Sequence, residues 1–260
     1  QIWYNTTKGT LRGLPFISGW AIGSNLVENR SLANGAGTAT AGLVMGGSST
    51  APIAPGVDGK TFEYNGSGYS PGGTMSTARY DAQAAGTQTA AFQIGGLQAG
   101  PNSKTETQIY NGSSWTEVND LTTTREALAG AGTTTAALAF GGRTPTNQSV
   151  TETWNGTNWT EVNDLNTARG YNPGSSGTTT AGLCFGGRVD PNPAVTAKTE
   201  YYNGTSWSAN PATMGTAVQL MGNSSSCPSS AAIKFGGASP VTAATEEYTE
   251  PVGTGSITTS

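Results

Sequence analysis

The sequence contains no histidine among its 260 residues. Without an imidazole the chain cannot build a serine–histidine–aspartate triad or a cysteine–histidine pair, and it has no histidine to offer a metal. These kinds of active site are excluded. We therefore expect a protein that is not an enzyme and that needs no cofactor and no metal.

Cysteine, charge and long apolar runs are also scarce. The two cysteines, Cys184 and Cys227, fall in different layers of adjacent repeats, so we expect no disulfide bridge. Only 11% of the residues are charged and the net charge is −4, which gives no basic surface for nucleic acid. No run of 18 apolar residues is present, so we expect no membrane insertion.

The sequence does contain one motif that is repeated five times. Each copy has an apolar run ending in a glycine pair, then two aromatic residues a few positions apart. In four copies an arginine follows the second aromatic residue by ten positions, whereas in the fifth copy Trp207 is followed at that distance by Ala217. The glycine pairs are 49, 46, 45 and 50 residues apart, at Gly46-Gly47, Gly95-Gly96, Gly141-Gly142, Gly186-Gly187 and Gly236-Gly237. This period indicates a repeat architecture.

Each copy predicts four short strands, because Thr, Val, Tyr and Trp are interrupted by Gly, Asn and Pro every eight to twelve residues. Four of the breaks are Asn-Gly directly after an aromatic residue, which is a strong hairpin signal. These turns lie at Asn65, Asn111, Asn155 and Asn203. We interpret the Asn-Gly-Ser/Thr sequence at each one as turn chemistry rather than as a glycosylation site.

A single four-stranded sheet exposes both faces and cannot fold alone, so successive sheets must stack on one another. Radial stacking of such sheets is the β-propeller solution. We therefore predict an all-β fold, a five-bladed β-propeller of four-stranded blades. Its innermost strands are rich in Gly, Ala and Ser, as a narrow centre requires.

The chain ends predict how the ring closes. The first copy begins with a fourth strand at Trp20, and the last copy ends with a third strand at Tyr248. We predict that these N-terminal and C-terminal strands pair, so that one blade contains both ends and no sheet edge stays open. The predicted parts are a lead-in hairpin segment at 1–19, the propeller at 20–248 and a C-terminal tail at 249–260.

The glycine pair, the Tyr or Trp of the third strand and the Trp of the fourth strand resemble the kelch repeat family. The resemblance covers about residues 20–248 and recurs five times. It implies a propeller of kelch-like blades. In kelch domains that recognise acidic peptides, arginines near the start of the innermost strand reach the ligand.

Candidate binding residues follow from the repeat and its loops. The arginines near the innermost strands are Arg30, Arg79, Arg125 and Arg169, and Arg143 and Arg188 directly follow a glycine pair. Arginines around one mouth can hold carboxylates or acidic sugars through bidentate hydrogen bonds. The alternative is that each arginine ties its own blade connection to a nearby carbonyl or carboxylate.

The segments between the second and third strands vary most in length, and insertions of repeat proteins usually carry the binding function. They span Ser48–Thr61, Leu97–Glu106, Arg143–Thr151, Arg188–Thr199 and Ala238–Thr245. Their polar side chains add Asn102, Lys104, Asp190 and Asn192 to the candidate set.

Carboxylates give a weaker signal. Pairs such as Glu117 with Asp120 and Glu161 with Asp164 recur at one place in the repeat, which favours a role in the scaffold over glycoside hydrolysis. The Asp58-Gly59-Lys60 and Asp190-Pro191-Asn192 loops lack the spaced oxygen ligands of a calcium site.

The amino-acid sequence of the repeats shows a second resemblance. Thr-, Ala- and Gly-rich copies of this form look like kelch-type domains in structural proteins of bacteriophages, and the stretch from Gln1 to Arg12 resembles a hairpin of phage tail and fibre proteins. The resemblance implies a location on the virion surface, with other virion proteins and a host surface glycan or protein as partners. A secreted bacterial adhesion or carbohydrate-binding module is the alternative, ahead of a polysaccharide-acting enzyme.

Overall fold

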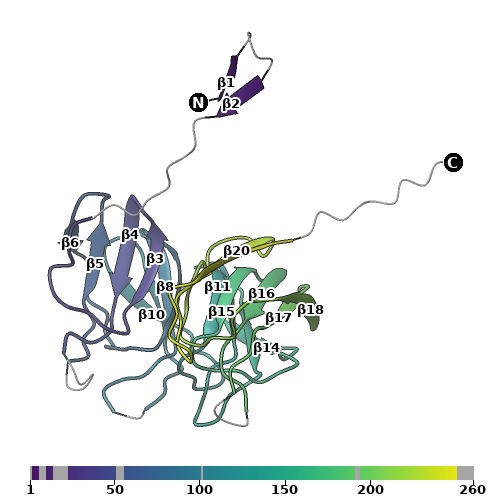
Figure 1. Cartoon of the computed structure of the whole chain (residues 1–260). Helices are drawn as coiled ribbons and strands as arrows, with labels where there is room; N and C mark the ends of the chain where they lie inside the picture. The colour runs from purple at the N-terminus through teal and green to yellow at the C-terminus, as the bar shows by residue number, and fades with distance from the viewer. Residues whose placement is uncertain are drawn as a thin grey trace.

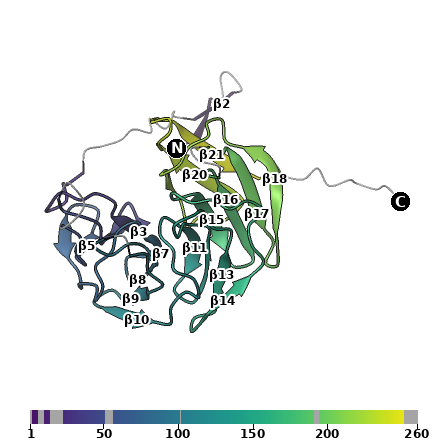
Figure 2. The ribbon, with the colours of Figure 1, turned by 90° about the horizontal axis from the view of Figure 1, so that it is seen from below.

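The chain forms a five-bladed β-propeller, as the repeat count predicts. The computed structural model describes residues 2–5, 10–13, 23–50, 56–100, 102–190 and 194–250, and every element in them is a β-strand. Blade sheets stand side by side around a centre (Figure 1, Figure 2), with β3, β7, β11 and β15 as innermost strands of the first four blades and β19 in the fifth.

The strands of each sheet follow one another in chain order and pair antiparallel. Blades 1 and 2 contain β3 (Asn34–Thr38), β4 (Ala41–Met45), β5 (Thr61–Tyr64), β6 (Tyr69–Pro71), β7 (Gln83–Thr87), β8 (Ala90–Ile94), β9 (Thr107–Tyr110) and β10 (Trp115–Val118). Blades 3 and 4 contain β11 (Ala129–Thr133), β12 (Ala136–Phe140), β13 (Thr151–Trp154), β14 (Trp159–Val162), β15 (Gly174–Thr178), β16 (Ala181–Phe185), β17 (Lys198–Tyr202) and β18 (Trp207–Thr213).

Blade 5 has three strands within the described residues: β19 (Gly222–Asn223), β20 (Ala231–Phe235) and β21 (Thr245–Thr249). The strand predicted to complete it, around Trp20, lies outside the described residues. Near the N-terminus, β1 (Ile2–Asn5) and β2 (Thr10–Gly13) form a separate antiparallel hairpin.

The third and fourth strands are hairpins because of the Asn-Gly turns. In each turn the asparagine Oδ1 accepts hydrogen bonds from the backbone N–H groups two and three residues later, at 2.8–2.9 Å. The glycines that follow have φ of 89–94°, a region that side chains disfavour. The predicted turn chemistry is thereby confirmed.

Tryptophans of the fourth strands join neighbouring blades. The indole N–H donates to the hydroxyl of the first residue of the preceding blade's third strand, at 2.9 Å in three interfaces. The pairs are Trp115 with Thr61, Trp159 with Thr107, and Trp207 with Thr151. Removing such an aromatic side chain from a core costs on the order of 3–5 kcal/mol, so these contacts define the blade interfaces.

The narrow centre predicted from the small residues is confirmed. It holds a polar cavity of about 210 Å³ lined by the innermost strands. The Asn34 amide donates to the Ala82 carbonyl, and the Gln83 amide donates to the Gly130 carbonyl, so side chains link adjacent blades here. Ser225 of blade 5 reaches across to the Ala84 carbonyl of blade 2 at 3.2 Å.

Candidate binding surface on the loop face

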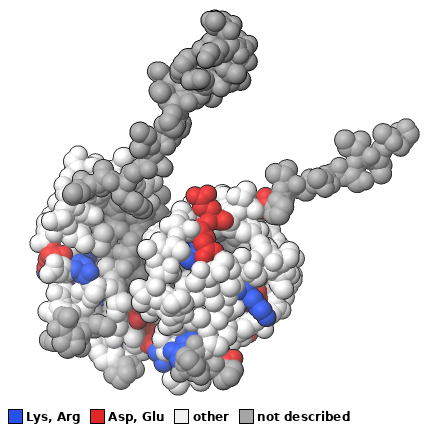
Figure 3. All heavy atoms as spheres, viewed as in Figure 1, with Lys and Arg blue, Asp and Glu red and all other residues white. Residues whose placement is uncertain are grey.

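The loops between second and third strands gather with the blade connections at one end of the ring, the lower end in Figure 1. We call this end the loop face. Charged side chains are sparse on the side drawn in Figure 3, and some of the Lys and Arg side chains lie close to this end with Asp and Glu side chains beside them. The predicted binding residues on it separate into a buried group and an exposed group.

The arginines that start the innermost strands are buried. The side chains of Arg30, Arg79, Arg125 and Arg169 are at most 1% exposed. In each of them Nη1 donates to the carbonyl of the first glycine in the blade's own glycine pair, at 2.8–3.1 Å. This geometry corresponds to the alternative considered above, in which the arginines tie blade connections, and it leaves no guanidinium edge for a ligand.

Carboxylates complete these buried contacts. Glu152 accepts from Arg125 at 2.7 Å and Glu200 accepts from Arg169 at 2.5 Å. In blade 2, Gln108 stands at the equivalent place, and burial lowers the pKa of Arg79 to about 10. Arg30 instead pairs with Asp58 at 2.6 Å, so the carboxylate of that candidate calcium loop is already engaged.

Arg143 and Arg188 behave differently from these four. Their guanidinium carbons lie over the ring of Tyr171, at 4.8 Å and 4.6 Å from its centroid, within the range of cation–π attraction. Both arginines and the tyrosine are partly exposed. The structure thus brings together two predicted candidates on one aromatic platform.

The two arginines differ in their charge partners. Arg143 forms an ion pair with Glu126 at 3.2 Å, and the Ser103 hydroxyl holds that carboxylate from its other oxygen at 2.9 Å. Burial raises the pKa of Asp81, and the charge of Arg143 partly offsets that effect. By contrast, within the described ranges Arg188 has no carboxylate in ion-pair distance.

Tyr171 was not predicted as a site residue. It occupies a position that adopts φ of 47–60° in all five blades, with Leu32, Asp81, Ala127 and Leu220 as its counterparts. Its carbonyl accepts from the Leu220 N–H at 2.8 Å, which helps to fix the position beside the next blade. An aromatic residue two places after a repeat arginine was the signal that could have found it.

The other loop candidates do not join this cluster. Asp190 and Asn102 are exposed, and Lys104 lies 3.9 Å from Glu106. Asn192 lies outside the described residues. The repeated carboxylates Asp120 and Asp164 accept backbone N–H groups of Thr107 and Thr151 at 3.2–3.3 Å, which is a scaffold role.

Within the part of the chain that the structure describes, no three His, Cys, Asp or Glu side chains are grouped as a metal ion requires. The same residues contain no helix of the length and apolarity needed to cross a membrane. Both cysteines are free thiols, Cys184 buried and Cys227 partly exposed.

Comparison with protein-family models found no match, and comparison with curated proteins found none either. The kelch type of the repeats and the relation to phage proteins therefore stay predictions from the sequence.

Proposed function

We propose that this propeller is a non-enzymatic binding module that takes a carboxylate-bearing ligand, an acidic glycan or a protein segment, on its loop face. The observation that carries the proposal is the Arg188 guanidinium, stacked on Tyr171 without a carboxylate partner among the described side chains. A stacked guanidinium keeps its N–H edge available, and that edge matches a carboxylate bidentately. Arg143, already paired with Glu126, supports the platform.

We further propose that the module is a virion structural protein, a tail-fibre or decoration module that binds the host surface. Support comes from the amino-acid sequences of the repeats and of the N-terminal hairpin, which resemble those of phage structural proteins. Mass spectrometry of purified phage particles tests this part. Peptides of the chain at fixed stoichiometry in particles support it, and their occurrence in bacterial secretions alone favours the secreted adhesion module.

The ligand class is tested with galacturonate oligosaccharides and their methyl esters, in which a methyl group on each carboxylate removes its negative charge. We expect the acids to bind more tightly than the esters in calorimetry. Arg188→Gln removes the charged hydrogen bonds, worth about 1.5–3 kcal/mol, so the preference for acids should fall about tenfold or more. Equal binding of acids and esters by the unaltered protein contradicts an acidic ligand of this class.

Tyr171→Leu offers a matched test of the platform. Leucine stands at the equivalent place in blades 1 and 5 with the same backbone conformation, so this variant is expected to fold. It should weaken binding of the acidic oligosaccharides, because Arg188 loses the ring that orients it. The control is Lys60→Gln, which changes an exposed cation of blade 1 and should leave binding unchanged.

A further inference from the structure

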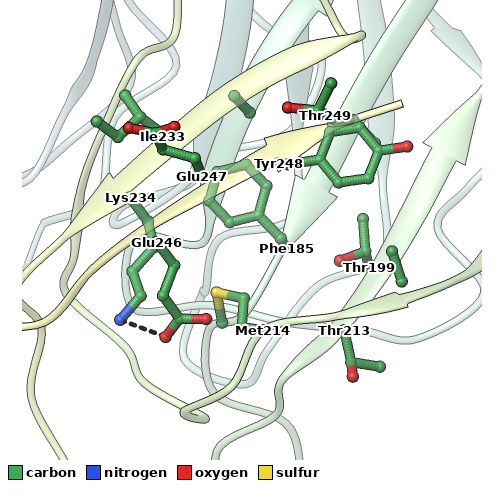
Figure 4. Close-up of a pocket in the computed structure, with 13 residues that line it drawn as sticks. Phe185, Thr199, Thr213, Met214, Ile233, Lys234, Glu246, Glu247, Tyr248 and Thr249 are labelled. Atoms are coloured by element: carbon green, nitrogen blue, oxygen red, sulfur yellow. Dashed lines mark ion pairs between the residues drawn. The ribbon is translucent and has the colours of Figure 1, made fainter. Parts of the chain in front are cut away.

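A cavity of about 210 Å³ lies between blades 4 and 5 (Figure 4). Phe185, Thr199 and Met214 of blade 4 line one side of it. Residues of blade 5 line the other side, among them Tyr248 and the ion pair between Lys234 and Glu246 at 3.0 Å. We call this cavity the interblade socket. Its lining is mainly apolar apart from the ion pair, Glu247 and the threonine hydroxyls.

At the three preceding interfaces a tryptophan indole fills the corresponding place. Trp207 shows the pattern: its N–H donates to Thr151 at 2.9 Å, and its ring packs on Phe140 at 4.8 Å and on Tyr202 at 5.1 Å. Trp159 and Trp115 make the same hydrogen bond one and two interfaces earlier.

The interblade socket repeats this set of contacts without the indole. Thr199 pairs with Phe185 across β16 and β17, as Thr151 pairs with Phe140 across β12 and β13. Tyr248 stands in β21 where Tyr202 stands in β17. None of the described side chains donates a hydrogen bond to the Thr199 hydroxyl. The socket is therefore shaped for an indole whose N–H points at Thr199.

The outer edge of blade 5 also lies beside the socket. In blades 1–4 the third strand pairs with a fourth strand, whereas β21 has a neighbour on one side only among the described strands. An open strand edge is a template for another strand. A tryptophan-bearing strand laid antiparallel on β21 would satisfy the edge and fill the socket together.

The start of the described propeller indicates which strand this is. Gly72 and Gly73, three and four residues after Tyr69, lie against the Tyr110 hydroxyl and the Ser113 carbonyl of the next blade. Gly23 lies against the Tyr64 hydroxyl of blade 1, and Ser24 donates to the Ser67 carbonyl. Residues 23–24 thus meet blade 1 as residues 72–73 meet blade 2. In the sequence, Trp20 precedes Gly23 by three residues, as Tyr69 precedes Gly72.

We propose that the interblade socket binds the indole of Trp20, carried on a strand that pairs with β21 within the same chain. The expected register sets Trp20 opposite Tyr248 and Ala21 opposite Glu247, as Trp207 is set opposite Tyr202 and Ser208 opposite Tyr201. The indole N–H then donates to the Thr199 hydroxyl. Blade 5 becomes the meeting point of the two chain ends.

A disulfide tests the register in the full-length chain. Ala21→Cys with Glu247→Cys, in a Cys227→Ser background, brings two Cα atoms within the span of a disulfide if they are cross-strand partners. We expect an intramolecular disulfide on oxidation, detected by mass spectrometry. Ile22→Cys with Glu247→Cys is the control, shifted by one residue, and should react less. No disulfide in the first variant overturns the proposal, and a disulfide-linked dimer does so by assigning the socket to a second copy.

A double-mutant cycle tests the indole contact itself. Trp20→Phe removes the N–H donor and Thr199→Val removes the acceptor, so each is expected to lower the melting temperature by about 2–4 °C, with little added by combining them. Trp207→Phe with Thr151→Val, whose hydrogen bond is 2.9 Å long, is the positive control. Additive losses in the Trp20 cycle, beside coupling in the control cycle, overturn the proposal.

Discussion

Arginine has two different roles in this protein, and the position in the repeat decides which. Arg125 lies ten residues after a fourth-strand tryptophan and is buried under its blade connection. Arg188 follows a glycine pair and lies over Tyr171 at the surface. A buried guanidinium must have its donors satisfied by the protein, whereas a surface guanidinium can exchange water for a ligand. Burial therefore separates scaffold from candidate site.

The buried ion pair predicts an asymmetric response to substitution. Arg125→Met leaves the Glu152 carboxylate buried without its cation, so we expect a loss of about 3–5 kcal/mol in the free energy of unfolding. Glu152→Gln should cost much less, because Gln108 occupies the same place beside Arg79 in blade 2. Urea denaturation measures both variants. A larger loss for Glu152→Gln than for Arg125→Met would contradict the assignment.

The two thiols should differ in reactivity. Burial raises the pKa of Cys184 to about 12, and its side chain is inaccessible, while Cys227 is partly exposed. Because thiolate is the reactive form, we expect one equivalent of thiol to react with a disulfide reagent at pH 8 in the native protein, and two after unfolding. Cys227→Ser should leave no rapidly reacting thiol. Rapid labelling of that variant would show that Cys184 is accessible.

At the scale of the element, blade 5 lacks the arginine of the other repeats, and a lysine on a different strand takes its place beside the carboxylate of Glu246. The Gly187 N–H donates to the Val218 carbonyl as the Gly142 N–H donates to that of Arg169. Val218 is thus the structural counterpart of the repeat arginines, in place of Ala217. Val218 therefore follows the fourth-strand tryptophan, Trp207, by one residue more than the arginines of the other blades do. The pairing of β17 with β18 shifts in register between these two positions. Lys234, buried in β20, supplies the missing cation to Glu246.

The ion pair between Lys234 and Glu246 should make the stability of the fold depend on pH. Burial raises the pKa of Glu246, but hydrogen bonds from Lys234 and from the backbone N–H groups of Gly215 and Thr216 lower it more, so the net pKa lies below its ordinary value of 4.5. The contribution of Glu246 to stability is present above that value and is lost as the pH falls through the lower, folded-state pKa.

Lys234→Met should therefore cost about 1–2 kcal/mol at pH 7, and it should weaken the dependence of stability on pH in the acid range. Denaturant unfolding between pH 3 and pH 7 measures both effects. An unchanged pH dependence would mean that Lys234 does not set the pKa of Glu246.

At the scale of the whole molecule, the blades are held by contacts between residues that lie far apart in the chain, 56 positions in one case and 141 in another. The Trp207 indole reaches Thr151, and Ser225 reaches Ala84 across the centre. Because each blade depends on its neighbours for a closed core, we expect the ring to unfold as one unit.

Deletion of Gln1–Trp20 is expected to abolish cooperative unfolding and to lower the melting temperature, since it removes the strand predicted to close the ring. Deletion of residues 1–13 removes the β1–β2 hairpin but keeps Trp20, and it should leave the transition unchanged. Circular dichroism and tryptophan fluorescence measure both transitions. An unchanged melting profile after the longer deletion would refute the closure.

The strands, the Asn-Gly hairpins and the number of blades could all be predicted from the sequence. These features depend on local signals, namely turn residues with positive φ and an alternation of side chains that repeats five times. Such signals act within a few residues and do not depend on contacts with the neighbouring blades. The shape of the ring follows once five such sheets must cover one another's faces.

Which polar residues face the solvent could not be predicted without the arrangement of the blades in space. Arg125 meets Glu152 from 27 positions away, and Tyr171 meets both Arg143 and Arg188 from different loops. Lys234 replaces a repeat arginine from another strand. Burial and charge pairing depend on distances between segments far apart in the chain, and no local pattern encodes those distances.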